Sequence, residues 1–336
     1  MTHEFKNILE TYLLAKEQAT RAVLATVVAL EGSSYRKPGV RMLLLENGTM
    51  IGAVSGGCVE KDIARQSEAV FHEDKPRMMT YDGRYRLGCE GILYILLEPF
   101  RPDETCVSKL QECFLLRNEF ELKSTFMMQE GNAAGLGTSV MIQGQSYLLN
   151  PTLQPSEELK SFVEVMPPCF KLMIFGAEHD AVQLCQFAAG TGWEVTVISG
   201  PLESKSFENF PGATAFYSVS PDQVALEQID DQTAVMVMSH NFANDLKFLL
   251  ELKETKPAYL GLLGPAHRRE KLLDQLLEYC PELSQEFIDS IHGPAGLNIG
   301  AETPQEIAIS ILSEVLSTVR EKTPIPLKKK KGGIHA

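Results

Sequence analysis

Short apolar segments alternate with helical patterns through the second half of the chain, and this alternation constrains the fold most. Each apolar segment has the length of one strand, and the residues after it repeat apolar positions at helical spacing. Strands that are apolar throughout are typical of parallel sheets covered by helices on both faces. The pattern therefore predicts a doubly wound α/β domain, with strands at 170–175, 193–198, 234–238 and 258–263 and a last helix opened by the capping residues Thr303, Pro304 and Glu306.

The turn after the first of these strands, Gly176-Ala177-Glu178, lies where a dinucleotide-binding fingerprint would begin. In that fingerprint a second glycine lets the backbone approach the pyrophosphate, and an acidic residue about 20 positions later binds the ribose. Glu178 instead brings bulk and negative charge, and the next strand ends in Ser199-Gly200. Binding of NAD(P) is therefore the less favoured interpretation.

Two other interpretations of this turn remain open. Gly176 and Ala181 can serve packing alone, Gly176 in the sharp bend and Ala181 in a close contact between helix and strand. Alternatively, Glu178, His179 and Asp180 form a polar or metal-assisting site at the start of the helix. Adjacent residues rarely bind one metal together, so we assign no metal ligand.

The first region has the signals of a mixed sheet with a few helices. A helical pattern over 2–19 precedes a strand pattern over 22–30, and Asn47-Gly48 predicts a tight type I′ hairpin. From residue 101 the signals blur until the pair Pro167-Pro168, where we place the domain boundary. The expected organisation is an N-terminal mixed α/β domain over 1–100, a mixed connecting region over 101–168, a Rossmann-like domain over 169–320 and a tail over 321–336.

The segment Ser55-Gly56-Gly57-Cys58 is the sharpest local feature of the first region. It follows a strand pattern and precedes a helical one, so backbone N–H groups and the helix dipole should converge near Cys58, a setting that lowers a thiol's pKa and holds anions. The preceding cations Arg36 and Arg41 could meet the same anion. A second glycine-flanked cysteine is Cys89. The alternative is that the glycines serve turns and the cysteines fill small spaces in the core.

Composition narrows the classes of protein. The chain of 336 residues has a formal net charge of −13, which disfavours a nucleic-acid binder. No apolar run approaches the roughly 20 residues of a membrane span, and the amino terminus lacks the features of a signal peptide. We therefore expect a cytoplasmic protein without a membrane partner, whose seven cysteines are free thiols rather than a disulfide framework.

Motifs from both regions resemble the xanthine dehydrogenase accessory factor family, the XdhC/CoxI-like proteins. They are GSSYRKPGVRML, GAVSGGCVE and LGCEG in the first region, and IFGAEHDA, MSHNFANDLKFL, YLGLLGPAHRREKLL and IHGPAGLNIGAETPQEIAISILSEV in the second. The resemblance covers nearly the whole chain in the same order. It implies an N-terminal XdhC/CoxI-like domain followed by a Rossmann-like XdhC C-terminal domain.

The function that the resemblance implies is that of an accessory factor for molybdenum hydroxylases of the xanthine dehydrogenase type. Such a protein binds the molybdenum cofactor transiently, assists its sulfuration and passes it to the apoenzyme, which makes it a chaperone rather than a catalyst. Its implied partners are the molybdenum hydroxylase apoenzyme and a cysteine desulfurase, and a homodimer is expected. Candidate cofactor-binding residues in the first region are Arg36, Arg41, Ser55, Gly56, Gly57, Cys58, Glu60 and Cys89.

The second region departs from the family at Glu178, where relatives have a more glycine-like turn, and at Ser199, where they tend to have an acidic residue. Polar residues nevertheless follow several strands, and we expect His179, His240 and Arg268 to line one crevice. Candidate residues there are Gly176, Glu178, His179, His240, Gly264 and Arg268. The alternative function is an NAD(P)- or nucleotide-dependent oxidoreductase or transferase, and a further possibility is a divergent relative that only scaffolds a partner.

Overall fold

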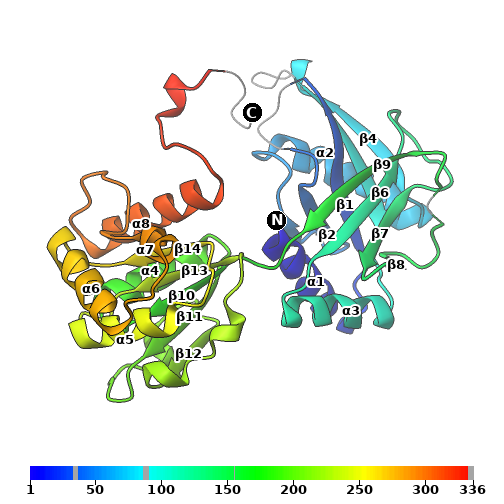
Figure 1. Cartoon of the computed structure of the whole chain (residues 1–336). Coiled ribbons are helices and arrows are strands. Elements are labelled where there is room, and N and C mark those ends of the chain that lie inside the picture. Colours follow the sequence, from blue (N-terminus) through cyan, green and yellow to red (C-terminus); the bar gives the residue numbers. More distant parts are fainter. Residues whose placement is uncertain (33–36, 86–90, 155, 332–336) are drawn as a thin grey trace. The chain divides into compact units, whose positions relative to one another are not determined.

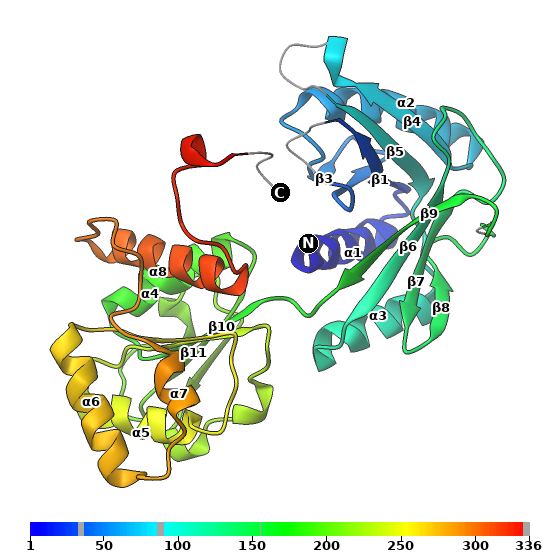
Figure 2. The same ribbon diagram turned by 45° about the horizontal axis from the view of Figure 1, so that its top comes forward.

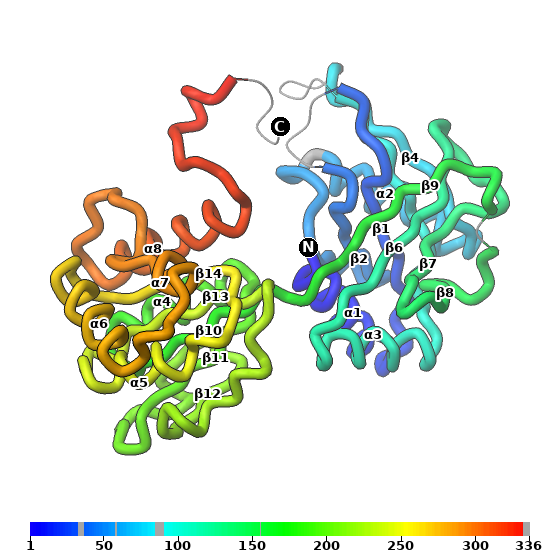
Figure 3. Tube along the Cα trace, viewed as in Figure 1, coloured from blue at the N-terminus to red at the C-terminus, as the bar shows by residue number. Residues whose placement is uncertain are grey.

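A computed structural model describes residues 1–32, 37–85, 91–154 and 156–331, with only the backbone of Cys58 and Tyr85 included. The chain forms two compact units, and the boundary between them in the sequence lies between Pro168 and Cys169. Figures 1 and 3 follow the path of the chain through each unit. No helix among the described residues is long and apolar enough to cross a membrane.

The first sheet of the N-terminal unit is antiparallel, with the order β3-β2-β1-β5-β4. Alternate residues of β1 contribute to opposite faces, as the period of two in a strand requires. Val23, Ala25 and Val27 pack with helix α2, whereas Leu24 belongs to the core that contains α1. The elements are α1 Thr2–Glu17, β1 Ala22–Glu31, β2 Arg41–Leu45, β3 Met50–Gly52, α2 Cys58–Glu73, β4 Arg77–Asp82, η1 Gly83–Tyr85 and β5 Ile92–Pro99.

The hairpin predicted at Asn47-Gly48 is present, but its turn is not type I′. Gly48 has a φ of 89°, whereas Asn47 does not have a positive φ. The amide of Gly48 donates to the carbonyl of Leu45 at 2.9 Å, and the Asn47 side chain accepts from the Thr49 amide at 3.0 Å. Of these two residues only the glycine takes the left-handed conformation, which it adopts without the steric cost of a Cβ atom.

A second antiparallel sheet, with the order β8-β7-β6-β9, completes the N-terminal unit. Helix α3 shares one apolar core with α1, in which Phe5 and Leu110 meet residues of both sheets such as Leu43 and Leu122. The expected connecting region therefore folds together with the residues before it. Its elements are α3 Glu104–Leu116, β6 Phe120–Phe126, β7 Gly137–Ile142, β8 Gln145–Leu148 and β9 Lys160–Met166.

Two buried polar contacts join the two sheets of this unit. Glu98 on β5 accepts hydrogen bonds from the amide and the hydroxyl of Thr138 on β7, at 2.9 and 2.5 Å. Burial raises the pKa of Glu98 to about 7, although the bonds from Thr138 and the charge of Arg41 act in the opposite direction. Arg41 on β2 pairs with Glu164 on β9 at 2.5 Å.

The C-terminal unit is built on a six-stranded parallel sheet with the order β12-β11-β10-β13-β14-β15. Numbered from the first strand of the unit, this order is 3-2-1-4-5-6, the order of a dinucleotide-binding Rossmann fold. The predicted doubly wound architecture is confirmed. The strands are β10 Lys171–Phe175, β11 Glu194–Ser199, β12 Ala215–Ser218, β13 Thr233–Val237, β14 Tyr259–Leu262 and β15 Ile291–His292.

Helices cover both faces of the parallel sheet (Figure 2). Helices α4 and α8 bury Ala181 and Ile311 in a core on one face, while α5, α6 and α7 pack on the other. The capping box predicted for the last helix is confirmed, since Thr303 and Glu306 exchange hydrogen bonds. The helices are α4 His179–Gly190, α5 Phe242–Leu252, α6 Ala266–Tyr279, α7 Gln285–Ser290 and α8 Pro304–Val319, with short 3-10 turns η2 Phe207–Asn209, η3 Pro221–Gln223, η4 Leu226–Gln228 and η5 Leu327–Lys329.

Candidate functional site

The turn before helix α2 is held by its own side chains. The carboxylate of Glu60 accepts from the amide and hydroxyl of Ser55, at 2.6 and 2.5 Å, and from the amide of Gly57 at 2.9 Å. The hydroxyl of Ser55 in turn accepts from the amide of Val59 at 3.2 Å. Helix α2 then begins at Cys58. The sequence therefore builds a capped helix N-terminus at the point where an anion cradle was predicted.

The charge state of Glu60 follows from these bonds. Partial burial acts to raise its pKa, but hydrogen bonds from the Ser55 hydroxyl and from backbone amides lower it by more. The net result is a pKa below the usual range, so Glu60 is ionised near neutral pH. A negative charge of the protein itself therefore lies at the N-terminus of α2, where the helix dipole favours it.

The two glycines of the turn have different reasons to be glycine. Gly57 has a φ of 117°, which a residue with a side chain rarely adopts. Gly56 has no such requirement, and a Cβ atom built on it would have no atom within 4 Å. Packing among the described residues therefore does not demand a glycine at position 56. Close approach of another molecule would demand one.

Four predicted residues of the first region do not contribute described side chains to this turn. Arg36, Cys89 and the side chain of Cys58 lie outside the described residues. Arg41 requires a correction: it is 5% exposed and bound to Glu164 and to the carbonyl of Gly39, so it does not face a surface where a phosphate could meet it. The physical reason is that a buried guanidinium needs a carboxylate partner, and Glu164 supplies it.

In the C-terminal unit, Gly176 lies at the point where the strand order reverses, between β10 and β13. It has a φ of 140°, and a Cβ atom there would lie 2.3 Å from the carbonyl oxygen of Met238. The Met238 amide donates to the Phe175 carbonyl at 2.8 Å, so the loop after β13 packs directly on the turn. Gly176 is therefore required by contact between two loops of the protein, which supports the packing interpretation of this turn.

Polar side chains at the carboxyl edge of the parallel sheet form ion pairs with one another. Asp180 on α4 lies 3.3 Å from His240, and Glu178 lies 3.6 Å from Lys205. Asp245, a buried residue of α5, accepts from Arg268 at 2.6 Å. The carboxylates of Glu178 and Asp245 thus neutralise Lys205 and Arg268, two cations that would otherwise attract an anionic ligand.

The structure brings together part of the predicted crevice. The loop that contains His240 lies near Arg268 in the first turn of α6, because Asp245, which binds Arg268, also accepts from the amide and hydroxyl of Ser239, at 3.0 and 2.5 Å. Gly264 lies beneath Arg268, whose Cδ would be 2.7 Å from a Cβ at that glycine. His179 is exposed at the start of α4, and Asp180 rather than His179 makes the contact with His240.

The sequence interpretation missed the central role of Asp180 and Asp245 in this network. The sequence did contain one signal for these two residues. They lie in the first turns of α4 and α5, where carboxylates complement the helix dipole. Across residues 1–32, 37–85, 91–154 and 156–331, no group of three or more His, Cys, Asp or Glu side chains is arranged to hold a metal ion.

Comparisons with known proteins match both parts of the chain. A family model described as the XdhC Rossmann domain matches residues 172–315, and one described as the XdhC and CoxI family matches residues 15–82. A probable subunit of xanthine dehydrogenase from Bacillus subtilis is 29% identical over 332 residues, covering 94% of this chain and 97% of the relative. The molybdenum cofactor insertion chaperone PaoD of Escherichia coli is 28% identical, covering 94% of this chain and 89% of the relative.

A solved structure has the same fold. It is a crystal structure from Bacillus halodurans, described as a xanthine dehydrogenase, and it is 26% identical to this chain. The TM-score is 0.77, and the match covers 94% of this chain and 96% of the other.

Proposed function

Because this chain belongs to the XdhC and CoxI family and carries its XdhC Rossmann domain, we propose that it is an accessory factor for molybdenum hydroxylases. In this role it binds the molybdenum cofactor transiently, assists its sulfuration and inserts it into the apoenzyme. The observation that carries the proposal is the alignment with a relative named as a molybdenum cofactor insertion chaperone over 94% of this chain.

The turn before α2 fits such a cargo in part. Molybdopterin carries a phosphate and a dithiolene around a soft metal, so its handler needs an approachable backbone and a polarisable group. Gly56 supplies an open backbone position, and Cys58 supplies a sulfur at the first residue of a helix. Glu60 already accepts the Gly57 amide, so a phosphate at this turn would compete with that carboxylate.

Burial makes the cysteines with described side chains poor candidates for cofactor handling. The five cysteines whose side chains are described are free and buried. Burial raises the pKa of Cys106 to about 12 and that of Cys185 to about 11, and it raises the pKa of Cys113 as well. Thiols of this kind are inert as nucleophiles and metal ligands. This supports Cys58 as the residue on which cofactor handling depends, with Cys89 as the second candidate.

The decisive comparison is between Cys58→Ala and Cys113→Ala. Each protein is loaded with molybdenum cofactor, freed of excess and mixed with an apo-hydroxylase. We expect Cys58→Ala to lose retained molybdenum, measured by mass spectrometry, and to restore little hydroxylase activity. Cys113→Ala, which removes a buried thiol from the same unit, should behave as the wild type. Equal retention and transfer by Cys58→Ala and the wild type would refute the role of Cys58.

The alternative, an NAD(P)- or nucleotide-dependent oxidoreductase or transferase, is favoured by one observation, the 3-2-1-4-5-6 strand order of the C-terminal unit. The contact between Gly176 and Met238 and the carboxylates of Glu178 and Asp180 weigh against it. Calorimetry with NAD(P) on the protein that is tested with molybdenum cofactor separates the two functions. Saturable NAD(P) binding without cofactor retention would favour the oxidoreductase.

We extend the proposal to partners and assembly. Acquisition of the terminal sulfur calls for a cysteine desulfurase, and handing a cofactor to a larger client suits a homodimer. Co-purification with a desulfurase and the mass of the full chain in solution, measured by light scattering, test these two points independently.

A further inference from the structure

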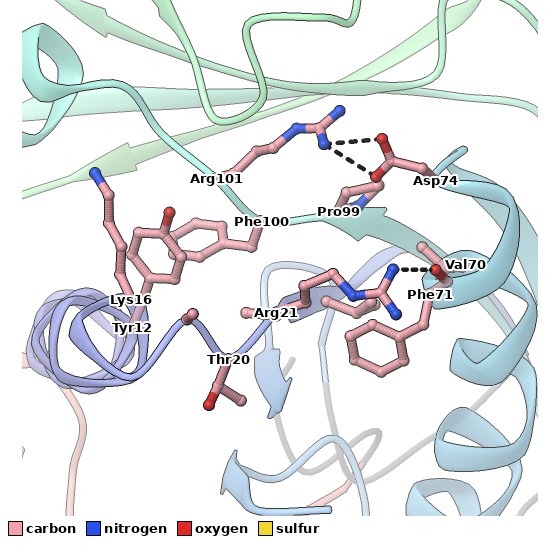
Figure 4. Close-up of a pocket in the computed structure, with 13 residues that line it drawn as sticks. Tyr12, Lys16, Thr20, Arg21, Val70, Phe71, Asp74, Pro99, Phe100 and Arg101 are labelled. Atoms are coloured by element: carbon pink, nitrogen blue, oxygen red, sulfur yellow. Dashed lines mark hydrogen bonds and ion pairs between the residues drawn. The ribbon is translucent and has the colours of Figure 1, made fainter. Parts of the chain in front are cut away.

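A cavity of about 160 Å³ lies in the N-terminal unit where helices α1 and α2 end (Figure 4). A cavity of roughly 150 Å³ accommodates a ring the size of benzene. Its apolar wall includes Phe71, Phe100 and Val70, and its polar wall includes Tyr12, Lys16, Arg21, Asp74 and Arg101. The turn at Cys58 lies at the other end of α2, so this is a separate site.

The hydroxyl of Tyr12 is a hydrogen-bonding group of this cavity without a partner among the described residues. Tyr12 is only 5% exposed, and its ring packs edge-on against Phe100 with a centroid distance of 5.0 Å. No described residue forms a hydrogen bond with its hydroxyl, and the hydroxyl oxygen is not among the buried polar atoms that lack a partner, so it is open to solvent in the cavity. In Figure 4 the hydroxyl points to the side of the cavity on which Arg101 lies. The charge of Arg101 acts to lower the pKa of Tyr12, which agrees with this placement, while burial raises the pKa overall.

Two cations, Lys16 and Arg101, line the same cavity. Lys16, in the last turn of α1, forms no ion pair with any described residue. Arg101 is held by Asn150 at 2.9 Å, by Thr152 at 2.8 Å and by Asp74 at 2.8 Å. A guanidinium with five N–H donors keeps hydrogen-bonding capacity beyond these contacts. The orientation of Arg101 is therefore fixed before any ligand arrives.

The balance of charge favours an anion. The cavity is lined by three cations and one carboxylate, in a protein whose net charge is −13. Arg21 is occupied by Glu46 at 2.5 Å and by the Phe71 carbonyl, and Asp74 is occupied by Arg101. Lys16 also complements the dipole of α1, which gives it a structural role. The Tyr12 hydroxyl adds an uncharged donor that is open to the cavity.

We propose that this cavity binds a small organic anion. Its carboxylate or phosphate oxygens accept hydrogen bonds from Tyr12, Lys16 and Arg101, and its body, about the size of one ring, fills the space beside Phe71 and Phe100. Charge-assisted bonds to an oxyanion are the strong kind, and the apolar wall adds burial of the ring.

The test uses the full chain and four probes: benzoate, phenyl phosphate, benzyl alcohol and inorganic phosphate. We expect benzoate or phenyl phosphate to bind saturably with one site per chain, and benzyl alcohol and inorganic phosphate to bind more weakly. Benzoate and phenyl phosphate distinguish a carboxylate ligand from a phosphate ligand. Binding is followed by calorimetry and by ligand-observed NMR.

Two variants assign the binding to this cavity. Tyr12→Phe removes only the hydroxyl, and Lys16→Ala removes the unpaired ammonium; each should weaken binding about tenfold. Lys109→Ala, which removes a lysine from the surface of α3, is the matched control and should leave binding unchanged. Thermal unfolding checks that Tyr12→Phe retains the wild-type fold.

Several results would overturn the proposal. No saturable binding of either anionic ring up to about 10 mM would do so, as would binding that both variants leave unchanged. Equal binding of benzyl alcohol would show an apolar cavity without an anion site, and equal binding of inorganic phosphate would show that the ring is not recognised. None of these outcomes depends on molybdenum cofactor transfer.

Discussion

Replacing Glu98 by Gln tests whether a carboxyl group is buried between the two sheets of the N-terminal unit. Glu98 is 0% exposed, and the amide and hydroxyl of Thr138 are bound to it. Gln keeps a carbonyl oxygen for the Thr138 amide, and its NH₂ group can donate to the Thr138 hydroxyl oxygen. That oxygen lies 2.9 Å from the hydroxyl of Ser124, which can take the proton that Thr138 no longer donates to position 98. The substitution therefore removes the titratable carboxyl group at position 98 and preserves the hydrogen bonds with Thr138.

The expected magnitude follows from the difference between the folded and unfolded pKa values. The folded pKa is about 7 and the ordinary value is 4.5, so the folded state binds the proton more tightly. The associated stability is fully present below pH 4.5 and is lost as the pH rises through about 7. The difference between the two pKa values corresponds to a change of about 3 kcal/mol in the free energy of unfolding. We expect Glu98→Gln to lack this loss. As the pH is raised from acidic to alkaline, the free energy of unfolding of the variant should therefore increase by about 3 kcal/mol relative to that of the wild type.

The assay is urea unfolding at a series of pH values, followed by two signals. Circular dichroism follows both units, whereas the single tryptophan, Trp193, reports only on the C-terminal unit. The difference in the free energy of unfolding between variant and wild type should depend on pH when it is taken from circular dichroism. It should not depend on pH when it is taken from fluorescence. Glu121→Gln, the same change at an exposed position of β6, is the control and should stay within about 0.5 kcal/mol at every pH. Parallel pH profiles for the wild type and Glu98→Gln would refute the reasoning.

Two further predictions concern packing. Arg41→Ala leaves Glu164 buried without its partner and should destabilise the N-terminal unit by about 3–5 kcal/mol, measured by urea unfolding; a loss below about 1 kcal/mol would contradict a buried ion pair. Gly176→Ala forces a Cβ atom against the Met238 carbonyl at a positive φ and should destabilise the C-terminal unit by more than about 1 kcal/mol, seen in Trp193 fluorescence. Unchanged fluorescence unfolding of this variant would show that the turn has room for a side chain.

The sequence predicted the parallel sheet because its inner strands are short, apolar and followed by helical patterns. It did not predict β12 and β15, which lie at the two edges of the sheet. Strand β12 is only half-buried, and β15 has two residues, so neither has the apolar run that marks an inner strand. Short edge strands are recognised by their neighbours in space rather than by their own residues.

In the candidate site, too, local sequence patterns predict only features that are formed by neighbouring residues. The SGGC segment was predicted from local spacing because a glycine-rich turn and a helix start are local features. Arg41 resembles a surface cation in the sequence, and its burial depends on Glu164, which is 123 positions away. Tyr12 fits the apolar face of a helix, and only the tertiary structure shows that its hydroxyl faces a cavity and has no partner among the described residues. The surroundings of Arg41 and Tyr12 depend on residues distant in the sequence, and local patterns do not predict them.

The cap formed by Ser55 and Glu60 has a consequence for a protein that must give up what it carries. A helix end that depended on a bound anion would be left with unsatisfied amides when the anion departed, and this would slow release. Here the Ser55 hydroxyl and the Glu60 carboxylate satisfy those amides from within the chain. In the proposed role, the order of this turn therefore does not depend on a bound anion, and release of the cofactor would leave the helix end capped.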